Sequence, residues 1–471
     1  MVMGELHQET ELAIIGAGPG GYVAALRAAD LGREVILIEE RDRLGGTCLL
    51  EGCIPSKTLI HAVELAESAK HADQMGLKFS GLEFDTSVLL AYTERVIKTL
   101  TAGVKSLVKN RGIEVIEGRA RFTDNRTLNV EGTGKIDFRQ CIIATGSRIN
   151  ELPAAYEKPV WSSADALKLP SVPETLLVVG GGYIGLELGI VYAGLGSRVT
   201  MVEFFPQLLM GADFDLVDIM VKSVSNRFEE IRVDSKVTGI EKTSAGFTVD
   251  IDHEGESSRS EYEQVLVAVG RKPNTDDLGL ENTSIEPNEM GTIPVDEELR
   301  TSEKNIYAIG DAAPGPMLAH KASREAKVAA EVIAGHKSAF DNRAVPAVVF
   351  TDPEIAWTGL TQREAEAQGR EVNIGRFPLR ALGRARTLGR TEGMAKIISD
   401  PESNLVLGAG LVGPHASELI AEATLAIEMG ASLEDLMVTI HPHPTLSEAI
   451  MEAAEVGAGA PTHIPPVAKK S

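Results

Sequence analysis

Two cysteines stand five positions apart in residues 45–57, whose sequence is GGTCLLEGCIPSK. Five residues of a regular helix rise about 7.5 Å along its axis, whereas the Cα atoms of a disulfide lie no more than roughly 7 Å apart. A bond between Cys48 and Cys53 therefore requires a distorted turn, for which Gly52 is available. We expect such a bond to be easily reduced, and labile disulfides are more often catalytic than structural. Two buried thiols are the alternative interpretation.

The third cysteine differs in its surroundings. Cys141 begins a strand-like apolar run and is most simply a small buried hydrophobic residue. Three cysteines do not make a disulfide framework. In a reducing cytosol, a single close pair is instead a candidate for redox chemistry.

Length and charge restrict the classes of protein. A chain of 471 residues is too long to fold around one hydrophobic core, so we expect three or four domains. The net charge of −22 argues against nucleic-acid binding, which needs a basic surface. The N-terminal residues lack a signal-peptide pattern, and no apolar run approaches the roughly 20 residues of a membrane span. We predict a cytoplasmic protein, with a loosely held tail from Thr462 that contains a Lys-Lys pair.

A strand–turn–helix–strand unit occurs twice in the sequence. The first copy consists of a strand at 12–15, a glycine-rich turn at 16–21, a helix at 22–31 and a strand at 35–38 that ends in Glu39. The second consists of a strand at 176–179, a glycine-rich turn at 180–185, a helix and a strand at 199–202 that ends in Glu203. The first glycine and the final glutamate are 23 residues apart in both copies. Such agreement indicates two related dinucleotide-binding units.

The first unit has the context that a dinucleotide fingerprint requires. Gly16 permits a tight turn, Gly18 lets the backbone approach a pyrophosphate, and Gly21 allows close packing of helix on strand. The N-terminus of the helix favours phosphate. Glu39 is placed to accept hydrogen bonds from a ribose. A glycine-rich turn without a ligand is the alternative.

The second unit repeats these positions as Gly180, Gly182, Gly185 and Glu203. A carboxylate at the end of that strand suits a free ribose hydroxyl and repels a ribose phosphate. The residues after Glu203 are Phe-Phe-Pro-Gln, with no arginine to bind such a phosphate. We therefore predict that this unit binds NAD rather than NADP.

Two nucleotide units beside a redox cysteine pair predict a relay of electrons through a bound flavin. Hydride chemistry requires a cofactor, because side chains cannot perform it. FAD and NAD are accordingly the expected cofactors. His441 and His443 suggest a metal, but no third or fourth ligand follows at the usual spacing, so we predict none.

Several segments carry a resemblance to a known family. Residues 45–57 resemble the redox-active disulfide motif of the flavin pyridine-nucleotide-disulfide oxidoreductases. The segment IYAIGD at 306–311 is similar to their second flavin motif, and HPHPTLSE at 441–448 is similar to their interface-domain motif. The segment PMLAHKA at 316–322 resembles the dihydrolipoamide dehydrogenase branch in particular. The similarity runs from about residue 9 to 460, with the motifs in the expected order.

The resemblance implies roles for individual residues. Cys48 would exchange with dihydrolipoamide, and Cys53 would contact the flavin. Lys57 would lie near the reactive nitrogen of the flavin, paired with Glu187. His443, oriented by Glu448, would be the acid–base catalyst and would reach the cysteines of the partner subunit across a dimer interface. Such a base suits the reaction, because the attacking species is a thiolate and histidine titrates near neutral pH.

The resemblance also implies a fold and further cofactor contacts. We expect an α/β protein with two Rossmann-like dinucleotide-binding domains, a central domain and a C-terminal α+β interface domain for dimerisation. The expected boundaries are 1–149 for FAD, 150–272 for NAD, 273–345 for the central domain and 346–471 for the interface domain. The flavin motif assigns Asp311 to the ribityl chain, and we add Gly146, Ala319 and Gly270 to the cofactor-binding residues. The implied partners are a second copy of the chain and the lipoyl domains of a 2-oxo acid dehydrogenase or glycine cleavage complex.

Two positions depart from the family pattern. Leu50-Glu51 replaces the usual Asn-Val beside the cysteines, and the added carboxylate should disfavour a thiolate. Tyr183 replaces an aliphatic residue, and we interpret it as a lid over the flavin. A reductase for another disulfide, such as glutathione, and a flavin-bearing structural subunit are the alternative functions. The presence of both cysteines with His443 and Glu448 in one chain argues against the structural subunit.

Overall fold

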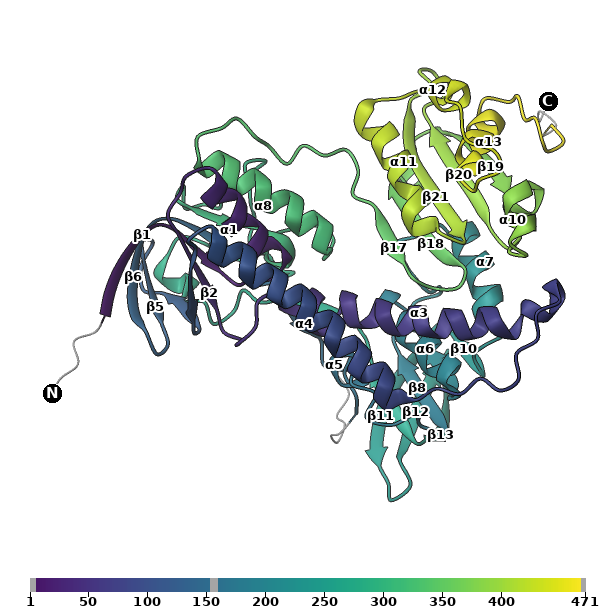
Figure 1. Ribbon diagram of the computed structural model, residues 1–471, viewed down its shortest axis with the longest axis horizontal. Helices are drawn as coiled ribbons and strands as arrows, with labels where there is room; N and C mark the ends of the chain where they lie inside the picture. Colours follow the sequence, from purple (N-terminus) through teal and green to yellow (C-terminus); the bar gives the residue numbers. More distant parts are fainter. Residues whose placement is uncertain (1–5, 153–159, 467–471) are drawn as a thin grey trace.

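The computed structural model describes residues 6–152 and 160–466 of the chain. Within these residues the strands form five sheets, which alternate with helices along the sequence. Figure 1 shows the first nucleotide-binding region at one end, the second below α3 and α6, and a C-terminal sheet with its helices above the second. The α/β fold class predicted from the sequence is confirmed.

The first sheet is mostly parallel, and its strands follow the spatial order β3-β2-β1-β6-β5-β4. The short strand β16 adds to β6 in parallel, so a segment distant in sequence completes this sheet. Its core strand β1 is solvent-free from Leu12 to Ile14, as expected for a parallel strand covered on both faces. The strands are β1 (Leu6–Ile15), β2 (Val35–Glu39), β3 (Glu114–Glu117), β4 (Ala120–Phe122), β5 (Thr127–Val130), β6 (Gly134–Ile143) and β16 (Ile306–Ala308).

Two helices pack together against this sheet, α1 (Pro19–Asp30) and α8 (Ala319–Ile333). Helix α1 begins at Pro19, three residues earlier than the sequence indicated. Proline is favoured in the first helical turn because its missing N–H would have no partner there. The long helix α4 (Thr86–Asn110) is capped by Asp85, which accepts hydrogen bonds from the backbone N–H groups of Ser87 and Val88.

Helix α3 (Cys53–Lys70) connects the nucleotide-binding regions. It follows the short helix α2 (Gly46–Glu51), packs against α4, and also packs against α6 (Tyr183–Leu195) of the second unit. In Figure 1 it runs from the first region across the second. The cysteine segment is therefore fixed between both nucleotide-binding units.

The second unit is a four-stranded parallel sheet in the order β10-β9-β8-β14. An antiparallel sheet of β11, β12 and β13 accompanies it, and a small ribbon pairs β7 with β15. The elements are β7 (Ser147–Ile149), α5 (Ser163–Ala166), β8 (Thr175–Val179), β9 (Arg198–Val202), α7 (Phe214–Val224), β10 (Glu230–Arg232), β11 (Ser235–Lys242), β12 (Phe247–His253), β13 (Glu256–Tyr262), β14 (Gln264–Val267) and β15 (Arg271–Pro273).

The C-terminal region is a five-stranded antiparallel sheet in the order β17-β18-β21-β20-β19. After α8 the chain crosses from the first region to this sheet, as Figure 1 shows. Its elements are β17 (Ala347–Val349), β18 (Glu354–Gly359), α9 (Gln362–Ala367), β19 (Asn373–Pro378), α10 (Gly383–Thr387), β20 (Met394–Ser399), β21 (Val406–Gly413), α11 (Ala416–Met429), α12 (Leu433–Val438) and α13 (Glu448–Gly457).

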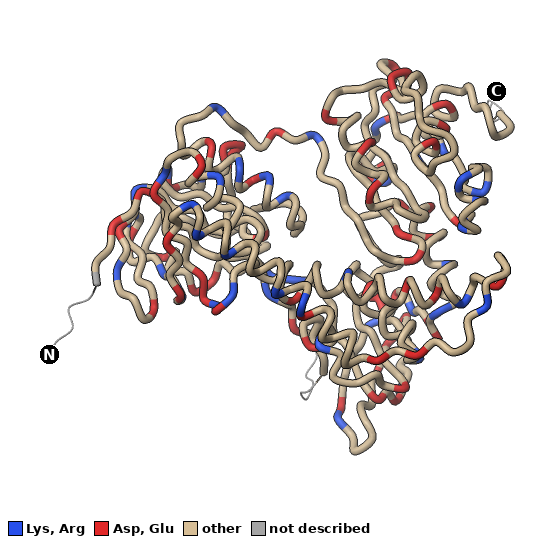
Figure 2. The backbone as a smooth tube through the Cα atoms, viewed as in Figure 1, with Lys and Arg blue, Asp and Glu red and all other residues tan. Residues whose placement is uncertain are grey.

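Short 3₁₀ turns complete the described structure: η1 (Ala72–Met75), η2 (Leu280–Asn282), η3 (Gly310–Ala312) and η4 (Leu379–Ala381). Acidic and basic residues are interspersed throughout the molecule, as Figure 2 shows. None of the helices among the described residues combines the length and apolar character needed to cross a bilayer.

Candidate active site

A disulfide joins Cys48 to Cys53 at the junction of α2 and α3. Gly52, with φ −142° and ψ −105°, leaves the helical conformation between the two cysteines. The Cα atoms of the cysteines consequently lie 4.7 Å apart, well below the rise of about 7.5 Å over five residues of an unbroken helix. The distorted turn predicted at Gly52 is confirmed.

The remaining cysteine is unreactive in this fold. Cys141 lies on β6 with no exposed surface. Burial raises the pKa of its thiol far above the ordinary value, so the nucleophilic thiolate is suppressed.

The first glycine turn is closely packed where the fingerprint requires it. Gly16 has φ +97°, and a Cβ added there would lie 2.4 Å from the carbonyl oxygen of Ala144. A Cβ at Gly21 would lie 1.7 Å from the Gly16 carbonyl oxygen. At Gly18 the nearest atom would be 3.9 Å away, on Gly46. The turn therefore tolerates only glycine at its two packed positions and leaves Gly18 open to a ligand.

The second turn repeats this arrangement. Gly180 has φ +110°, and a Cβ there would lie 2.4 Å from the carbonyl oxygen of Ala268. A Cβ at Gly185 would lie 2.0 Å from the Gly180 carbonyl oxygen, whereas one at Gly182 would meet no atom within 4 Å. Both units thus leave the middle glycine free for close approach by a phosphate group.

Each strand-ending glutamate binds the glycine turn of its own unit. Glu39 accepts hydrogen bonds from the N–H groups of Ala17, at 2.7 Å, and Arg41, at 3.2 Å. Glu203 accepts from Gly181, at 2.5 Å, and Phe205, at 2.8 Å. Burial raises the pKa of Glu39, and the backbone hydrogen bonds oppose that rise. These carboxylates therefore stabilise the glycine turns.

A cavity of about 590 Å³ links the first unit to the disulfide. Among its lining residues are candidates from four separate parts of the sequence: Gly16, Gly18, Glu39, Cys48, Cys53, Lys57, Gly146, Asp311 and Ala319. Gly21, Glu203 and Gly270 do not line it. The open glycine, the buried acid and the disulfide in one continuous space fit a flavin dinucleotide, because its phosphates and its reactive ring lie at opposite ends.

The wall that carries Asp311 is held by a buried ion pair that the sequence analysis missed. Glu325 accepts the N–H of Gly310 at 2.7 Å, while Lys321 donates to the Gly310 carbonyl at 3.3 Å. Lys321 and Glu325 also pair with each other at 2.7 Å, each with 3% of its side chain exposed. Their spacing of four residues on a helix is a visible signal, but the contact with Gly310 depends on the tertiary fold. Asp311 itself accepts a hydrogen bond from Ser147 at 2.5 Å.

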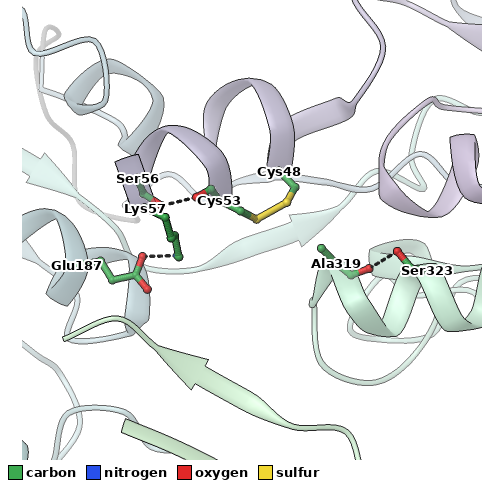
Figure 3. The surroundings of a disulfide bond; sticks show 7 residues. All are labelled: Cys48, Cys53, Ser56, Lys57, Glu187, Ala319 and Ser323. Atoms are coloured by element: carbon green, nitrogen blue, oxygen red, sulfur yellow. Dashed lines mark hydrogen bonds and ion pairs between the residues drawn. A yellow bond between two sulfur atoms is a disulfide. The ribbon is translucent and has the colours of Figure 1, made fainter. Parts of the chain in front are cut away.

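Lys57 and Glu187 meet beside the disulfide, as Figure 3 shows. The Lys57 Nζ lies 2.7 Å from Glu187 Oε2, and Glu187 is almost fully buried. The other Glu187 oxygen accepts the N–H of Phe350 at 3.1 Å, and Lys57 lies over the Phe350 ring. The pairing expected from the resemblance is thus present, and a residue preceding β18 fixes it from the C-terminal region.

Glu51 and Tyr183, which depart from the family pattern, both line the cavity. Glu51 forms an ion pair with Arg41 at 3.2 Å, so its charge has a partner. Tyr183 begins α6, lines the cavity and keeps 38% of its surface exposed. Burial of its hydroxyl raises the pKa of Tyr183. The lid role of Tyr183 and the redox effect of Glu51 stay predictions.

His443 and Glu448 form a pair in the C-terminal region. The His443 Nδ1 lies 2.9 Å from Glu448 Oε1, and the second Glu448 oxygen accepts the N–H of Thr445 at 2.8 Å. Although burial opposes it, these hydrogen bonds hold the pKa of Glu448 below its usual value. The His443 side chain is 77% exposed and does not line the cavity of its own chain.

The neighbouring His441 has a different partner. It lies 2.7 Å from Glu422 on α11. No group of three or more potential ligands for a metal ion occurs within residues 6–152 and 160–466.

Comparison with known proteins reports similarity over nearly the whole chain. Residues 10–326 match the family described as pyridine nucleotide-disulphide oxidoreductase, and residues 345–454 match its dimerisation domain. A dihydrolipoyl dehydrogenase of Geobacillus stearothermophilus is 46% identical over 98% of this chain and 99% of its own length. One of Halobacterium salinarum is 47% identical, with coverage of 98% and 99%. The solved structure of the HOCl-induced flavoprotein disulfide reductase RclA from Escherichia coli covers 93% of this chain and 98% of its own, with a TM-score of 0.83 and 29% identity.

Proposed function

The chain belongs to the pyridine nucleotide-disulphide oxidoreductase family, and from this premise we propose that it oxidises dihydrolipoyl groups with NAD. It is an oxidoreductase that uses FAD, NAD and a redox-active disulfide. The observation that best supports this proposal is that Cys48 and Cys53 line the same cavity as the first glycine turn. Thiol exchange and flavin chemistry would therefore share one cavity.

The proposed cofactor contacts follow the two repeated units. The first unit and the cavity wall would hold FAD through Gly16, Gly18, Gly21, Glu39, Gly146, Asp311 and Ala319. The second unit would hold NAD through Gly180, Gly182, Gly185, Glu203 and Gly270, whereas Glu187 of this unit lines the flavin cavity and pairs with Lys57. A flavin held in this way would supply the two-electron chemistry that connects the reduced cysteine pair with hydride transfer to NAD.

The thiol steps fall to the two cysteines. A thiolate of the reduced substrate attacks the Cys48 sulfur, the Cys48–Cys53 bond breaks, and Cys53 leaves as a thiolate. The second substrate thiol then attacks the mixed disulfide, which releases oxidised lipoyl and the Cys48 thiolate. Two electrons have passed to the cysteine pair, and two protons have left the substrate. Both attacks require deprotonated sulfur.

His443 is the proposed acceptor of the substrate protons. Its exposed ring and its bond to Glu448 suit a base that serves a neighbouring chain. Glu448 fixes the tautomer and stabilises the protonated ring. Because His443 does not line the cavity of its own chain, each active site would combine two subunits.

Lys57 provides positive charge where the reduced cysteines and the flavin carry negative charge. Glu187 and Phe350 hold its ammonium group beside the disulfide. Because its partner Glu187 is buried, the ammonium group of Lys57 is held in place and would stabilise an anion without reorganisation.

The remaining proposals concern assembly and organisation. We propose a homodimer formed through the dimerisation domain, which accepts the lipoyl domains of a multienzyme complex in the cytoplasm. The proposed domains are 1–149, 150–272, 273–345 and 346–471. No nucleic-acid or membrane partner is part of this proposal.

Steady-state assays test the substrate. The FAD-loaded protein should reduce NAD with dihydrolipoamide far faster than with glutathione. Cys48→Ser should lose at least about 10³-fold of that activity while it retains flavin, because the sulfur attacked by substrate is absent. Cys141→Ala is the matched control and should keep the activity. Faster turnover with glutathione, or full activity of Cys48→Ser, would contradict the proposal.

A further inference from the structure

Helix α13 presents a row of carboxylates beside the His443–Glu448 pair. Glu448, Glu452 and Glu455 lie at positions i, i+4 and i+7, so they share one face of the helix. Glu448 binds His443, and Glu452 binds His463 through its Oε1. The Oε2 atoms of Glu452 and Glu455 are buried, without a hydrogen-bond partner among the described residues.

Glu452 is a buried acid whose partner comes from beyond the helix. Its side chain is 3% exposed, whereas that of His463 is 64% exposed. Burying a carboxylate is costly unless an opposite charge or a hydrogen bond compensates it. His463 supplies that compensation, and the next residue, Ile464, packs against the core of the C-terminal region.

This contact corrects the sequence-based expectation of a loosely held tail from Thr462. His463 and Ile464 are anchored, because a buried acid and an apolar core attract them. The Lys-Lys pair at 469–470 lies outside the described residues.

The charge of His463 acts on both histidine–carboxylate pairs. The hydrogen bond that the ring donates to Glu452, together with the charge of Glu452, raises the pKa of His463 above the ordinary value, and the charges of Glu455 and Glu448 add to the rise. The contact with Glu452 therefore favours the protonated form of His463. Because Glu448 contributes to this rise, the charges of His463 and Glu448 interact. Glu448 is also the residue that orients His443.

Other charges around α13 have partners of their own. The helix packs against β19, β20 and α12. On β19 and β20, Arg376 and Lys396 pair with Asp215. On α12, Asp435 caps its own helix and Glu434 is exposed. His441 contributes its charge to Glu448 from the loop before α13.

We propose that Glu452 and His463 form a positioning pair that tunes the proton affinity of the acid–base residue His443. The protonated His443 ring is stabilised by Glu448 and would be stabilised further by a second negative charge on the same helix face. Protonated His463 offsets the charge of Glu452, so the row of acids does not make His443 too strong a base. The proposal rests on the proposed role of His443.

Two variants separate charge from packing. His463→Gln leaves the Glu452 carboxylate uncompensated, so the pKa of His443 should rise by about half a unit. The double variant Glu452→Gln/His463→Gln removes both charges, and the pKa of His443 should return near its wild-type value. A purely structural anchor predicts no such recovery, because the double variant lacks the same ion pair.

The measurements are a histidine NMR titration of the intact protein and the pH profile of kcat for dihydrolipoamide oxidation. In His463→Gln the acid limb of the pH profile should shift to higher pH together with the NMR pKa of His443. In the double variant both should return to their wild-type positions. His7→Gln, which removes a remote histidine–aspartate pair, should move neither.

The proposal fails if the His443 titration is unchanged in His463→Gln, or if the double variant shifts as far as the single one. Both results come from NMR without turnover. If the protein instead fails to oxidise dihydrolipoamide while the titrations behave as expected, the proposed function fails and the coupling stands.

Discussion

The two glycine units share their internal geometry but differ in what covers them. In both, the first glycine has a positive φ, the third packs on the first, and a glutamate accepts the N–H that follows the first glycine. In the first unit, Gly46 of α2 lies so close that a Cβ there would be 2.5 Å from Gly18. In the second, Gly182 has no neighbour of this kind, and Phe204 and Phe205 are exposed.

This difference matches the different tasks of two dinucleotides. The first unit opens into a cavity that is lined by α2, α3 and the start of α8, which suits a resident flavin. The second is accessible beside its glycine turn, which suits a cosubstrate that binds and leaves in every cycle. On this account, the same local motif would bind a permanent or an exchanging ligand, according to the elements packed over it.

The largest effects are expected when the first glycine of each turn is replaced, and the two replacements should impair different cofactors. Gly16→Val should yield protein without FAD, because the side chain would meet the Ala144 carbonyl in a backbone conformation that valine disfavours, at a cost of about 3 kcal/mol or more. Gly180→Val should keep FAD and lose NAD reduction. Flavin absorbance and NAD assays measure the two losses. Gly103→Ala is the control, because a Cβ there would have open space around it. Equal loss of flavin in both valine variants would contradict the assignment of the two turns to different cofactors.

A smaller effect is expected at the carboxylate of the second unit. Glu203→Arg should improve the use of NADP relative to NAD by roughly tenfold, since it removes a repelling charge and adds a phosphate ligand. The ratio of kcat/KM for the two nucleotides measures this change. Glu203→Arg also removes the hydrogen bond that Glu203 accepts from the N–H of Gly181. Glu203→Gln therefore serves as the control for the stability of the turn. An unchanged ratio would contradict the assignment of Glu203 to the ribose.

The smallest effect concerns the end of α3 that is distant from the disulfide. Burial, together with the neighbouring charges of Glu354 and Asp352, raises the pKa of Glu64 to about 7, although the charges of Arg390 and Arg227 oppose the rise. The folded protein therefore binds more protons than the unfolded chain between the ordinary carboxyl pKa and pH 7. Stability should fall as pH rises through this window.

Glu64→Gln removes this titration. Because the side chain is 36% exposed, solvent screening limits the expected gain near pH 8 to about 1 kcal/mol, with little gain near pH 5. Urea unfolding at both pH values measures it, and Glu83→Gln on the exposed surface is the control. A gain equal at both pH values would show that the charge of Glu64 is not its cause.

Local signals explain which features the sequence predicted. The glycine turns, their glutamates and the break at Gly52 follow from residue type and spacing alone, because they form within short segments. The clamp of Lys321 and Glu325 on Gly310, the Phe350 contact with Glu187 and the anchoring of His463 join segments that only the fold brings together. Helix α1 starts three residues before the predicted position because Pro19 is favoured in a first helical turn.

The most direct test of the central claim is the visible spectrum of the FAD-loaded protein after one equivalent of dihydrolipoamide. If the cysteine pair exchanges with substrate and Cys53 becomes a thiolate against the flavin, a long-wavelength thiolate-to-flavin band should appear, and Cys53→Ser should lack it. Oxidation of dihydrolipoamide at full rate without that band, or the same band in Cys53→Ser, would contradict the account.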